Sequence, residues 1–164
     1  MKTLVLIRHA KSDWGNSTLK DFDRPLNKRG MKDAPLMAKV LDNKDIKPDF
    51  ILTSSANRAI TTAKFFAQHF GLSDGHFSDN INIYRGNHRT YINLLNELDN
   101  KFDTVFLFGH NPEISYVASE MLNDFTEHIP TAGCIVIDFD IDDWIDIESV
   151  KGKLRLFDYP KNHK

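Results

Sequence analysis

The sequence predicts an α/β protein in which helices cover both faces of a mostly parallel central sheet. Apolar runs that are typical of buried strands alternate along the chain with segments of helical periodicity, as in successive βαβ units. Two of these runs, residues 4–7 and 105–108, contain only hydrophobic residues. Continuous hydrophobicity of this kind is expected for parallel strands that are buried on both faces.

Each apolar run predicts one strand and each periodic segment one helix. The expected strands are residues 2–7, 49–52, 104–108 and 133–139. The expected helices are residues 27–41, 56–70, 88–98 and 112–122. Pro35 lies inside the first helical pattern, where an interior proline costs about 3 kcal/mol. Alternatively, residues 28–34 form a turn that precedes the helix.

The pattern changes after residue 139. Residues 144–148 and 153–157 flank Val150-Lys151-Gly152 and predict two short strands or a hairpin. The acidic stretch 138–146 lacks the ligand spacing of a calcium loop, so it indicates a solvated turn rather than a metal site.

Length and composition indicate an ordinary globular protein. The 164 residues fit one domain, and the single Cys134 lies in an apolar run, where a packed core thiol is expected. The formal net charge is -2 with acids and bases interspersed, which argues against a nucleic-acid-binding surface. No segment approaches the roughly 18 apolar residues of a membrane span, and the N-terminal apolar run is too short for a signal peptide. We expect a monomeric, cytoplasmic protein.

Polar residues follow two of the apolar strands. Arg8 and His9 come directly after residues 4–7, and His110 comes shortly after residues 105–108. The carboxyl ends of strands are where open α/β sheets bind their ligands. A guanidinium at the end of a buried strand needs an anion, either internal or bound. The three side chains therefore indicate a site for phosphoryl groups.

Two expected helix starts carry further candidates. Asn111 as cap and Pro112 as first residue predict a helix directly after the second histidine, where free amides and the helix dipole favour an anion. Ser54 or Ser55 is expected to cap the helix at 56–70. Arg58 then lies in its first turn, where the dipole disfavours a cation. A residue that breaks a local rule after a strand often marks a functional site.

Arg24 lies in the loop after the first strand. The proline that follows it biases its backbone towards an extended conformation. Its side chain either reaches back to the strand ends or pairs with Asp21 or Asp23, and the sequence is compatible with both.

Taken in chain order, these segments resemble the histidine phosphatase superfamily, formerly called phosphoglycerate mutase-like, and within it the SixA-like phosphohistidine phosphatases. The matching segments are Arg8-His9-Ala10-Lys11-Ser12-Asp13-Trp14, Asp23-Arg24-Pro25-Leu26-Asn27-Lys28-Arg29-Gly30, Ser54 with Arg58-Ala59, and Gly109-His110-Asn111-Pro112. The resemblance implies a single histidine phosphatase domain over residues 1–164. It also implies a three-layer α/β/α sandwich, the phosphoglycerate mutase-like fold.

The resemblance further implies roles for individual residues. His9 matches the nucleophile that becomes phosphorylated, Arg8, Arg58 and His110 match the phosphate pocket, and Arg24 matches an additional arginine of the SixA-like branch. Phosphoryl transfer needs an in-line nucleophile and stabilisation of charge on three oxygens. Three guanidiniums and a protonated His110 are expected to supply that stabilisation without a metal or other cofactor. Because His9 must be neutral and His110 protonated, a bell-shaped pH profile is expected.

The expected substrate class follows from a missing acid. Superfamily members that act on phosphate esters commonly carry a glutamate before the third helix, whereas residues 80–86 contain no carboxylate. Imidazole departs readily once protonated, so the expected substrate is phosphohistidine in a protein, with Asp13 as an alternative acid.

Two other functions stay open, a phosphatase of small phosphate monoesters and a non-catalytic phosphate-recognition module. A zinc site of His9, His110 and an aspartate is disfavoured, because the arginines would repel a cation.

Overall fold

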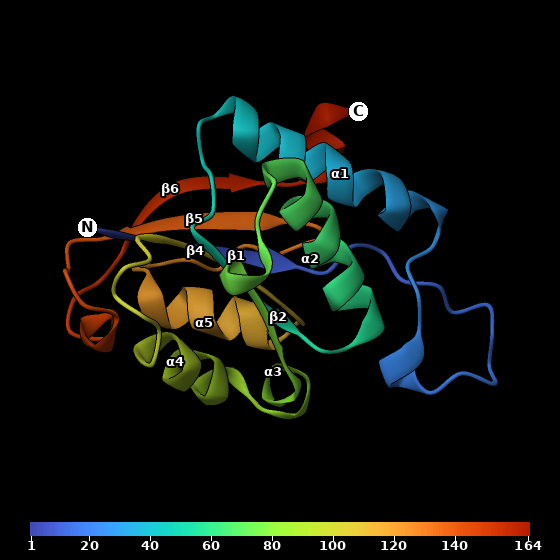
Figure 1. Cartoon of the computed structure of the whole chain (residues 1–164), viewed down its shortest axis with the longest axis horizontal. Coiled ribbons are helices and arrows are strands. Elements are labelled where there is room, and N and C mark those ends of the chain that lie inside the picture. The colour runs from blue at the N-terminus through green and yellow to red at the C-terminus, as the bar shows by residue number, and fades with distance from the viewer.

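The computed structural model describes residues 1–164 and contains one six-stranded sheet (Figure 1). The strands lie in the order β3-β2-β4-β1-β5-β6. They are β1 (Lys2–Arg8), β2 (Phe50–Ser54), β3 (Phe77–Asn80), β4 (Thr104–Gly109), β5 (Cys134–Phe139) and β6 (Lys153–Asp158). Strands β3, β2, β4 and β1 run parallel, and β5 is antiparallel to both of its neighbours. The predicted mostly parallel sheet is confirmed.

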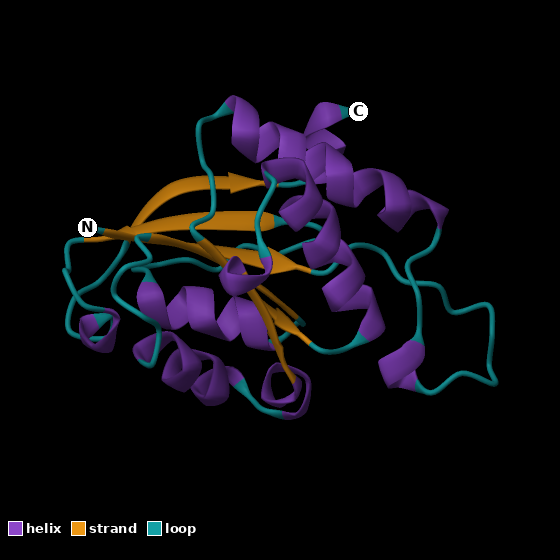
Figure 2. Cartoon of the chain, in the orientation of Figure 1, coloured by secondary structure: helices purple, strands orange, loops and turns teal.

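Helices cover both faces of the sheet, which gives three layers (Figure 2). The helices are α1 (Lys28–Asn43), α2 (Asn57–Phe70), the short α3 (Ile81–Arg85), α4 (His88–Asn96) and α5 (Glu113–Met121). Helices α1 and α2 pack together on one face, and α4 and α5 on the other. The α/β/α sandwich and the four predicted helices are therefore confirmed.

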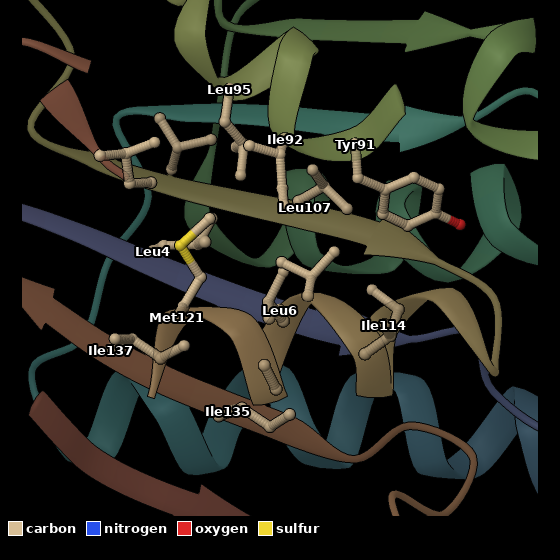
Figure 3. Packing of buried hydrophobic residues seen from close by; sticks show 14 of the residues in the cluster. Leu4, Leu6, Tyr91, Ile92, Leu95, Leu107, Ile114, Met121, Ile135 and Ile137 are labelled. Carbon is tan, nitrogen blue, oxygen red and sulfur yellow. The ribbon is translucent and has the colours of Figure 1, made fainter. Parts of the chain in front are cut away.

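Alternate residues of the central strands face opposite layers. Leu4 and Leu6 of β1 belong to the hydrophobic cluster beneath α4 and α5, together with Leu107 of β4 (Figure 3). Val5 and Ile7 belong to the cluster beneath α1 and α2. Because side chains alternate along a strand, a strand between two layers of helices must be hydrophobic at every position.

The register of β1 and β4 brings the two candidate histidines to the same edge. Arg8 pairs with Gly109, and the amide of His9 donates to the Gly109 carbonyl at 3.1 Å. His9 and His110 therefore follow neighbouring parallel strands. Gly109 allows this packing, because an added Cβ would lie 2.7 Å from the ring of Tyr91.

The prediction of a strand at residues 144–148 is wrong. Trp144–Asp146 forms a 3-10 helix, in which Trp144 is fully buried and donates from Nε1 to the Phe102 carbonyl at 2.8 Å. Residues 153–157 do lie in a strand, β6, but this strand pairs with β5. Burial of the indole ring against the core outweighs the local preference for a strand.

Strand β3 and the start of helix α1 are two further points on which the structure adds to the predictions. Strand β3 was not predicted because it is a short, largely polar edge strand that pairs only with β2. Helix α1 runs without interruption through Pro35, so no separate turn precedes it. Its N-terminus is capped by the side chain of Asn27, which accepts from the Gly30 amide at 2.9 Å. None of the helices combines the length and apolar composition that a membrane span requires.

Candidate active site

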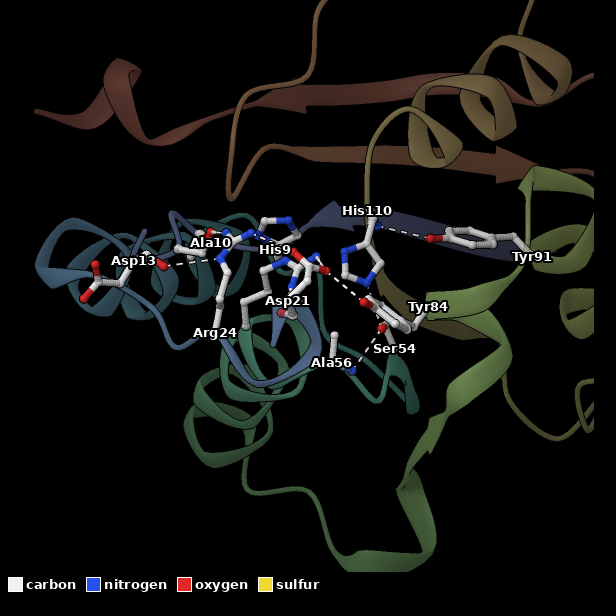
Figure 4. A network of polar contacts seen from close by, with 12 residues as sticks. His9, Ala10, Asp13, Asp21, Arg24, Ser54, Ala56, Tyr84, Tyr91 and His110 are labelled. Atoms are coloured by element: carbon white, nitrogen blue, oxygen red, sulfur yellow. Dashed lines mark hydrogen bonds and ion pairs between the residues drawn. The ribbon is translucent and has the colours of Figure 1, made fainter. Parts of the chain in front are cut away.

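The side chains of His9 and His110 lie next to each other at the carboxyl edge of the sheet (Figure 4). Their ring centroids are 5.2 Å apart. Both residues are buried, with 8% and 9% of their surface exposed. The structure therefore brings together the two histidines that the sequence analysis selected.

A hydrogen bond to a carbonyl fixes the tautomer of His9. Its Nδ1 lies 2.8 Å from the carbonyl oxygen of Ala10. Because that oxygen can only accept, Nδ1 carries the proton and Nε2 keeps a free lone pair. Burial, together with the positive charges of Arg58 and Arg8, lowers the pKa of His9 to about 3. The ring is therefore a neutral base near pH 7.

His110 is held from two sides. Its Nε2 lies 2.8 Å from Oγ of Ser54, and its backbone amide donates to the hydroxyl of Tyr91 at 3.1 Å. Burial, together with the charge of Arg58, lowers the pKa of His110 to about 4. The protonated His110 expected from the sequence is therefore not the state of the free protein, since a buried ring beside a guanidinium loses its proton.

Two buried polar atoms at this edge of the sheet have no hydrogen-bond partner. They are Nδ1 of His110 and Nε of Arg8, whose Nη1 donates to the Ile129 carbonyl at 2.9 Å. Burial also lowers the pKa of Arg8. An unpartnered buried polar group costs about 1–3 kcal/mol. Two such atoms in one place are typical of a site that a ligand completes.

Arg58 lies in the first turn of α2, as predicted, and is only 8% exposed. A hydroxyl connects it to the segment that carries the first histidine. Oγ1 of Thr62 donates to the Arg58 carbonyl at 2.7 Å and accepts from the Ala10 amide at 3.0 Å. The first turn of α2 is thereby fixed against the end of β1.

Neither serine caps α2, which corrects the prediction. The N-cap position is Ala56, which has no side-chain cap. Oγ of Ser54 accepts from the Ala56 amide at 3.2 Å and also contacts His110, while Oγ of Ser55 donates to Asp79 at 2.5 Å. Ser54 thus orients the second histidine instead of capping the helix.

Arg24 reaches the site through an acidic neighbour. Its Nη1 donates to Oδ1 of Asp21 at 2.8 Å, its Nε donates to the Asp13 carbonyl at 3.3 Å, and its Nη2 donates to Oγ of Ser12. The guanidinium also stacks on the ring of Trp14, at 3.3 Å from the ring centroid. Of the alternatives left open by the sequence, the structure shows the pairing with Asp21, which in turn contacts Arg58.

The structure does not bring the carboxylate of Asp13 into the histidine cluster. This carboxylate accepts from the Gly15 amide at 2.7 Å, is exposed, and points away from His9 (Figure 4). Only the backbone carbonyl of Asp13 takes part in the site, through its bond with Arg24.

Asp21 and Tyr84 also lie in the site, and the sequence predicts no role in it for either residue. Oδ2 of Asp21 accepts from Nη2 of Arg58 at 3.1 Å and from the Tyr84 hydroxyl at 2.9 Å. Partial burial raises the pKa of Asp21, but the bonds from Tyr84 and Arg58 outweigh it and hold the pKa below its usual value. The spacing of Asp21 three residues before Arg24 was a usable signal, whereas nothing in the sequence singles out Tyr84.

The assembled site is a cationic cluster with one internal carboxylate. It contains three arginines, two neutral imidazoles and Asp21. No group of three or more His, Cys, Asp or Glu side chains is arranged to hold a metal ion. Guanidiniums beside a neutral imidazole suit the binding of an anion next to a nucleophilic nitrogen.

Comparisons with known proteins concern the family and the fold. A family model described as the histidine phosphatase superfamily, branch 1, matches residues 4–81. An uncharacterized chloroplast protein of Arabidopsis thaliana is 43% identical over 63 residues, which are 38% of this chain. The chain covers only 29% of the length of that relative.

Two solved structures share the fold over nearly the whole chain. The SixA protein of Agrobacterium tumefaciens is 27% identical, with a TM-score of 0.83 over 97% of this chain and 98% of that chain. A protein histidine phosphatase SixA complexed with tungstate is 21% identical, with a TM-score of 0.83 over 99% of each chain, and shows the fold alone.

Residues 4–81 of the chain match the histidine phosphatase superfamily, and the whole chain is similar in fold to the SixA proteins. Its fold is phosphoglycerate mutase-like and, within that class, SixA-like. The family resemblance drawn from the sequence is confirmed, while the roles of the individual site residues stay predictions.

Proposed function

We propose that the protein is a phosphatase that removes the phosphoryl group from phosphohistidine in a protein, through a phospho-His9 intermediate. The observation that carries this proposal is the state of His9. The Ala10 carbonyl holds the proton on Nδ1, so that Nε2 offers a lone pair next to Arg8 and Arg58. A neutral imidazole is a competent nucleophile, and the guanidiniums attract the phosphoryl group that it attacks.

The reaction has two displacements at phosphorus. Nε2 of His9 forms a bond to phosphorus while the bond to the leaving nitrogen breaks, and that nitrogen takes the electron pair. Water then attacks phospho-His9, its oxygen stays on phosphorus, and the electron pair of the broken bond returns to Nε2. The protons of the water leave with the phosphate and the solvent. Nδ1 keeps its proton throughout, because the Ala10 carbonyl accepts from it.

The surrounding charges act on the transferred group. Arg8 and Arg58, with Arg24 at their side, offset the charge that spreads over three oxygens in the transition state. A bound phosphoryl group also favours the protonated form of His110. Nδ1 of His110, which has no partner in the free protein, then becomes a donor to the ligand. In this proposal the binding of the substrate creates the protonated His110 that the sequence predicts.

The choice of an N-phosphorylated substrate is supported by the lack of a suitable acid and by the likeness to SixA proteins. No carboxylate lies in residues 80–86, the Asp13 carboxylate points away from the site, and the pKa of Asp21 is too low for a proton donor near neutral pH. An ester oxygen needs such a donor far more than an imidazole nitrogen does. The likeness to proteins described as SixA points in the same direction. We further propose that residues 1–164 act as one catalytic domain without a metal or other cofactor.

The test uses a peptide with radiolabelled phosphohistidine and phenyl phosphate as the ester. Wild-type protein should release phosphate from the peptide much faster than from the ester, also in excess chelator. Rapid quenching should trap acid-labile label on the protein, and His9→Ala should abolish both label and turnover. His76→Ala, at the opposite edge of the sheet, is the matched control. Turnover by His9→Ala refutes the proposed nucleophile, and equal rates on the two substrates favour a small-molecule phosphatase.

A further inference from the structure

We infer that the carboxylate of Asp21 binds the leaving group of the reaction and holds the proton on the far ring nitrogen of a phosphorylated imidazole. Tyr84 and the arginines position this carboxylate. The inference rests on the proposed function and deepens it, because it assigns a recognition site for the part of the substrate that departs.

Asp21 lies at the mouth of the site. The side chains of His9, His110 and Arg58 are buried, whereas the carboxyl side chain of Asp21 is 47% exposed. Asp21 accepts from the buried Arg58 and from the hydroxyl of Tyr84, which is half-buried; Figure 4 shows Asp21 and Tyr84 bonded to each other. An in-line displacement places the leaving group on the side of phosphorus opposite His9. A leaving group that extends from the buried base to solvent therefore passes the Asp21 carboxylate.

The hydrogen bonds of Asp21 leave one position free. An ionised carboxylate offers about four lone-pair sites. Oδ2 uses both of its sites, on Nη2 of Arg58 and on the Tyr84 hydroxyl. Oδ1 accepts only from Nη1 of Arg24, at 2.8 Å. The remaining lone pair of Oδ1 is available to one further donor, and three fixed partners orient it.

An N–H group of a departing imidazole fits this acceptor. When the phosphorus–nitrogen bond of phosphohistidine breaks, the leaving nitrogen takes the electron pair. If the far nitrogen carries a proton, the ring departs as neutral imidazole, and if it does not, the ring must depart as an anion. An ionised carboxylate that accepts from the far N–H keeps the ring in the reactive protonated form. The Ala10 carbonyl does the same for His9 on the attacking side.

Charge and shape at the mouth favour the same ligand. The negative charge of Asp21 attracts a phosphorylated ring that carries a proton, and it repels an anionic leaving group. The ring of Tyr84 lies beside Arg58, at 6.0 Å from the guanidinium carbon, and beside the ring of His110, at a centroid distance of 5.7 Å. An aromatic face next to a carboxylate suits a flat cation.

The groups that face Asp21 come from three elements and its own loop. They are Arg24 from the loop, Arg58 from α2, Tyr84 from α3 and His110 after β4. Guanidiniums are permanently charged. The pKa of Tyr84 is raised above its usual value by the bond to Asp21, and the pKa of His110 is about 4. A bound phosphoryl group favours protonated His110 with every substrate. A change of rate between pH 6 and 8.5 that depends on Asp21 and is absent with a ring-free phosphate therefore reports the proton of the substrate ring.

The experiment measures kcat, at saturating substrate, at pH 6 and pH 8.5 for wild-type protein and Asp21→Asn, because the pH dependence of kcat reports groups in the enzyme–substrate complex. The substrates are a phosphohistidine peptide, 1-phosphoimidazole and phenyl phosphate, which has no ring nitrogen. The matched control is Asp23→Asn, which removes the same charge from the same exposed turn, where the Asp23 side chain has no partner. Tyr84→Phe keeps the ring and removes one bond to Asp21.

Asp21→Asn should raise the ratio of kcat at pH 6 to kcat at pH 8.5 by about tenfold on both N-phosphorylated substrates, because the bound ring then loses its proton at lower pH. The ratio on phenyl phosphate should change less than twofold, and Tyr84→Phe should give a smaller shift. An unchanged ratio, or the same change with phenyl phosphate or with Asp23→Asn, overturns the inference. Thermal unfolding and tungstate binding show whether Asp21→Asn keeps its fold. If this variant is unfolded, the role of Asp21 is structural and the inference is overturned.

The same data separate the inference from the proposed function. If the wild type hydrolyses 1-phosphoimidazole with the expected shift but leaves the peptide intact, the protein substrate is wrong and the role of Asp21 stands. If neither N-phosphorylated compound is hydrolysed, both proposals fail.

Discussion

At the scale of single residues, the two buried imidazoles differ in what their nitrogens contact. A carbonyl holds the proton on Nδ1 of His9 and leaves Nε2 free. His110 contacts a serine hydroxyl through Nε2 and has no partner at Nδ1. Burial lowers both pKa values. Because both rings are neutral in the free protein, their hydrogen bonds rather than their charges distinguish a nucleophile from a donor.

The first prediction concerns the titration of these rings. In the free protein, His9 and His110 should not titrate near pH 6.5, because their pKa values are about 3 and about 4. Tungstate should raise the pKa of His110 by at least about one unit, since a nearby anion favours the charged ring. Nuclear magnetic resonance of the histidine ring nitrogens against pH measures both values. A ring of His110 that titrates near pH 6.5 without ligand contradicts the prediction.

The second prediction tests the geometry of Arg58 separately from its charge. Arg58→Lys keeps the charge but loses the two-pronged donor that contacts the backbone and the carboxylate of Asp21. We expect kcat/KM to fall about 100-fold, and the free energy of unfolding to fall by no more than about 3 kcal/mol, since one buried charged hydrogen bond is lost. Arg89→Lys makes the same exchange in an exposed pair with Glu148 and should leave kcat/KM unchanged. Full activity of Arg58→Lys excludes a bidentate role.

The sequence identified the residues whose position alone is unusual. Arg8, His9 and His110 stand at the ends of buried strands, and Arg58 stands where the helix dipole opposes it. For Asp21 the sequence indicates only a possible pairing with Arg24. Its contact with Arg58 depends on how an irregular loop folds across α2, and no local periodicity encodes that path.

At the scale of elements, the turn after β4 depends on close packing between strand β4 and helix α4. Gly109 ends β4 against Tyr91 of α4, whose hydroxyl accepts from the amide of His110. The ring of Tyr91 is fully buried, and burial raises its pKa. The tyrosine thus fixes the backbone from which the second histidine projects.

The third prediction is that Gly109→Ala destabilises the protein. The new Cβ would lie 2.7 Å from Cε2 and from the hydroxyl oxygen of Tyr91, so the ring must move within a packed core. We expect the free energy of unfolding in urea to fall by about 1–3 kcal/mol. Gly75→Ala, where no atom lies within 4 Å of the new Cβ, should change it by less than about 0.5 kcal/mol. Equal stability of the two variants would show that the turn has room to adjust.

Elements with a strong pattern were predictable, and elements that depend on distant contacts were not. Strands β1 and β4 lie between two layers of helices, so their central residues are hydrophobic without interruption, and this pattern is visible in the sequence. Strand β3 is a short edge strand in which Phe77 packs against a hydrophobic cluster and the other three residues are polar, so it carries no strong apolar pattern. Trp144 adopts a 3-10 helix because its ring is buried against Phe102, a contact that the local sequence does not show.

At the scale of the whole molecule, the parallel sheet explains why distant segments meet at one edge. Strands β1, β2 and β4 are adjacent and parallel, so the residues after their carboxyl ends lie side by side. The loop that carries Asp21 then folds over this edge and contacts α2. The fold therefore places several arginine side chains close together. Asp21 offsets part of their mutual repulsion, and a bound anion would offset more.

The last prediction is that this arrangement makes stability depend on pH. His9 and His110 are neutral in the folded protein down to about pH 4, whereas in the unfolded chain they take up protons below about pH 6.5. The unfolded state then binds more protons than the folded state, so stability falls as pH falls through that window. From pH 7.5 to pH 5, each histidine should remove about 2 kcal/mol. Urea unfolding across that range should show a loss of about 4 kcal/mol from the pair, and His110→Gln should halve it. If His110→Gln loses as much stability as the wild type, another group takes up the proton and the prediction is wrong. Tungstate should diminish the loss of stability in the wild type, because it binds only the folded site.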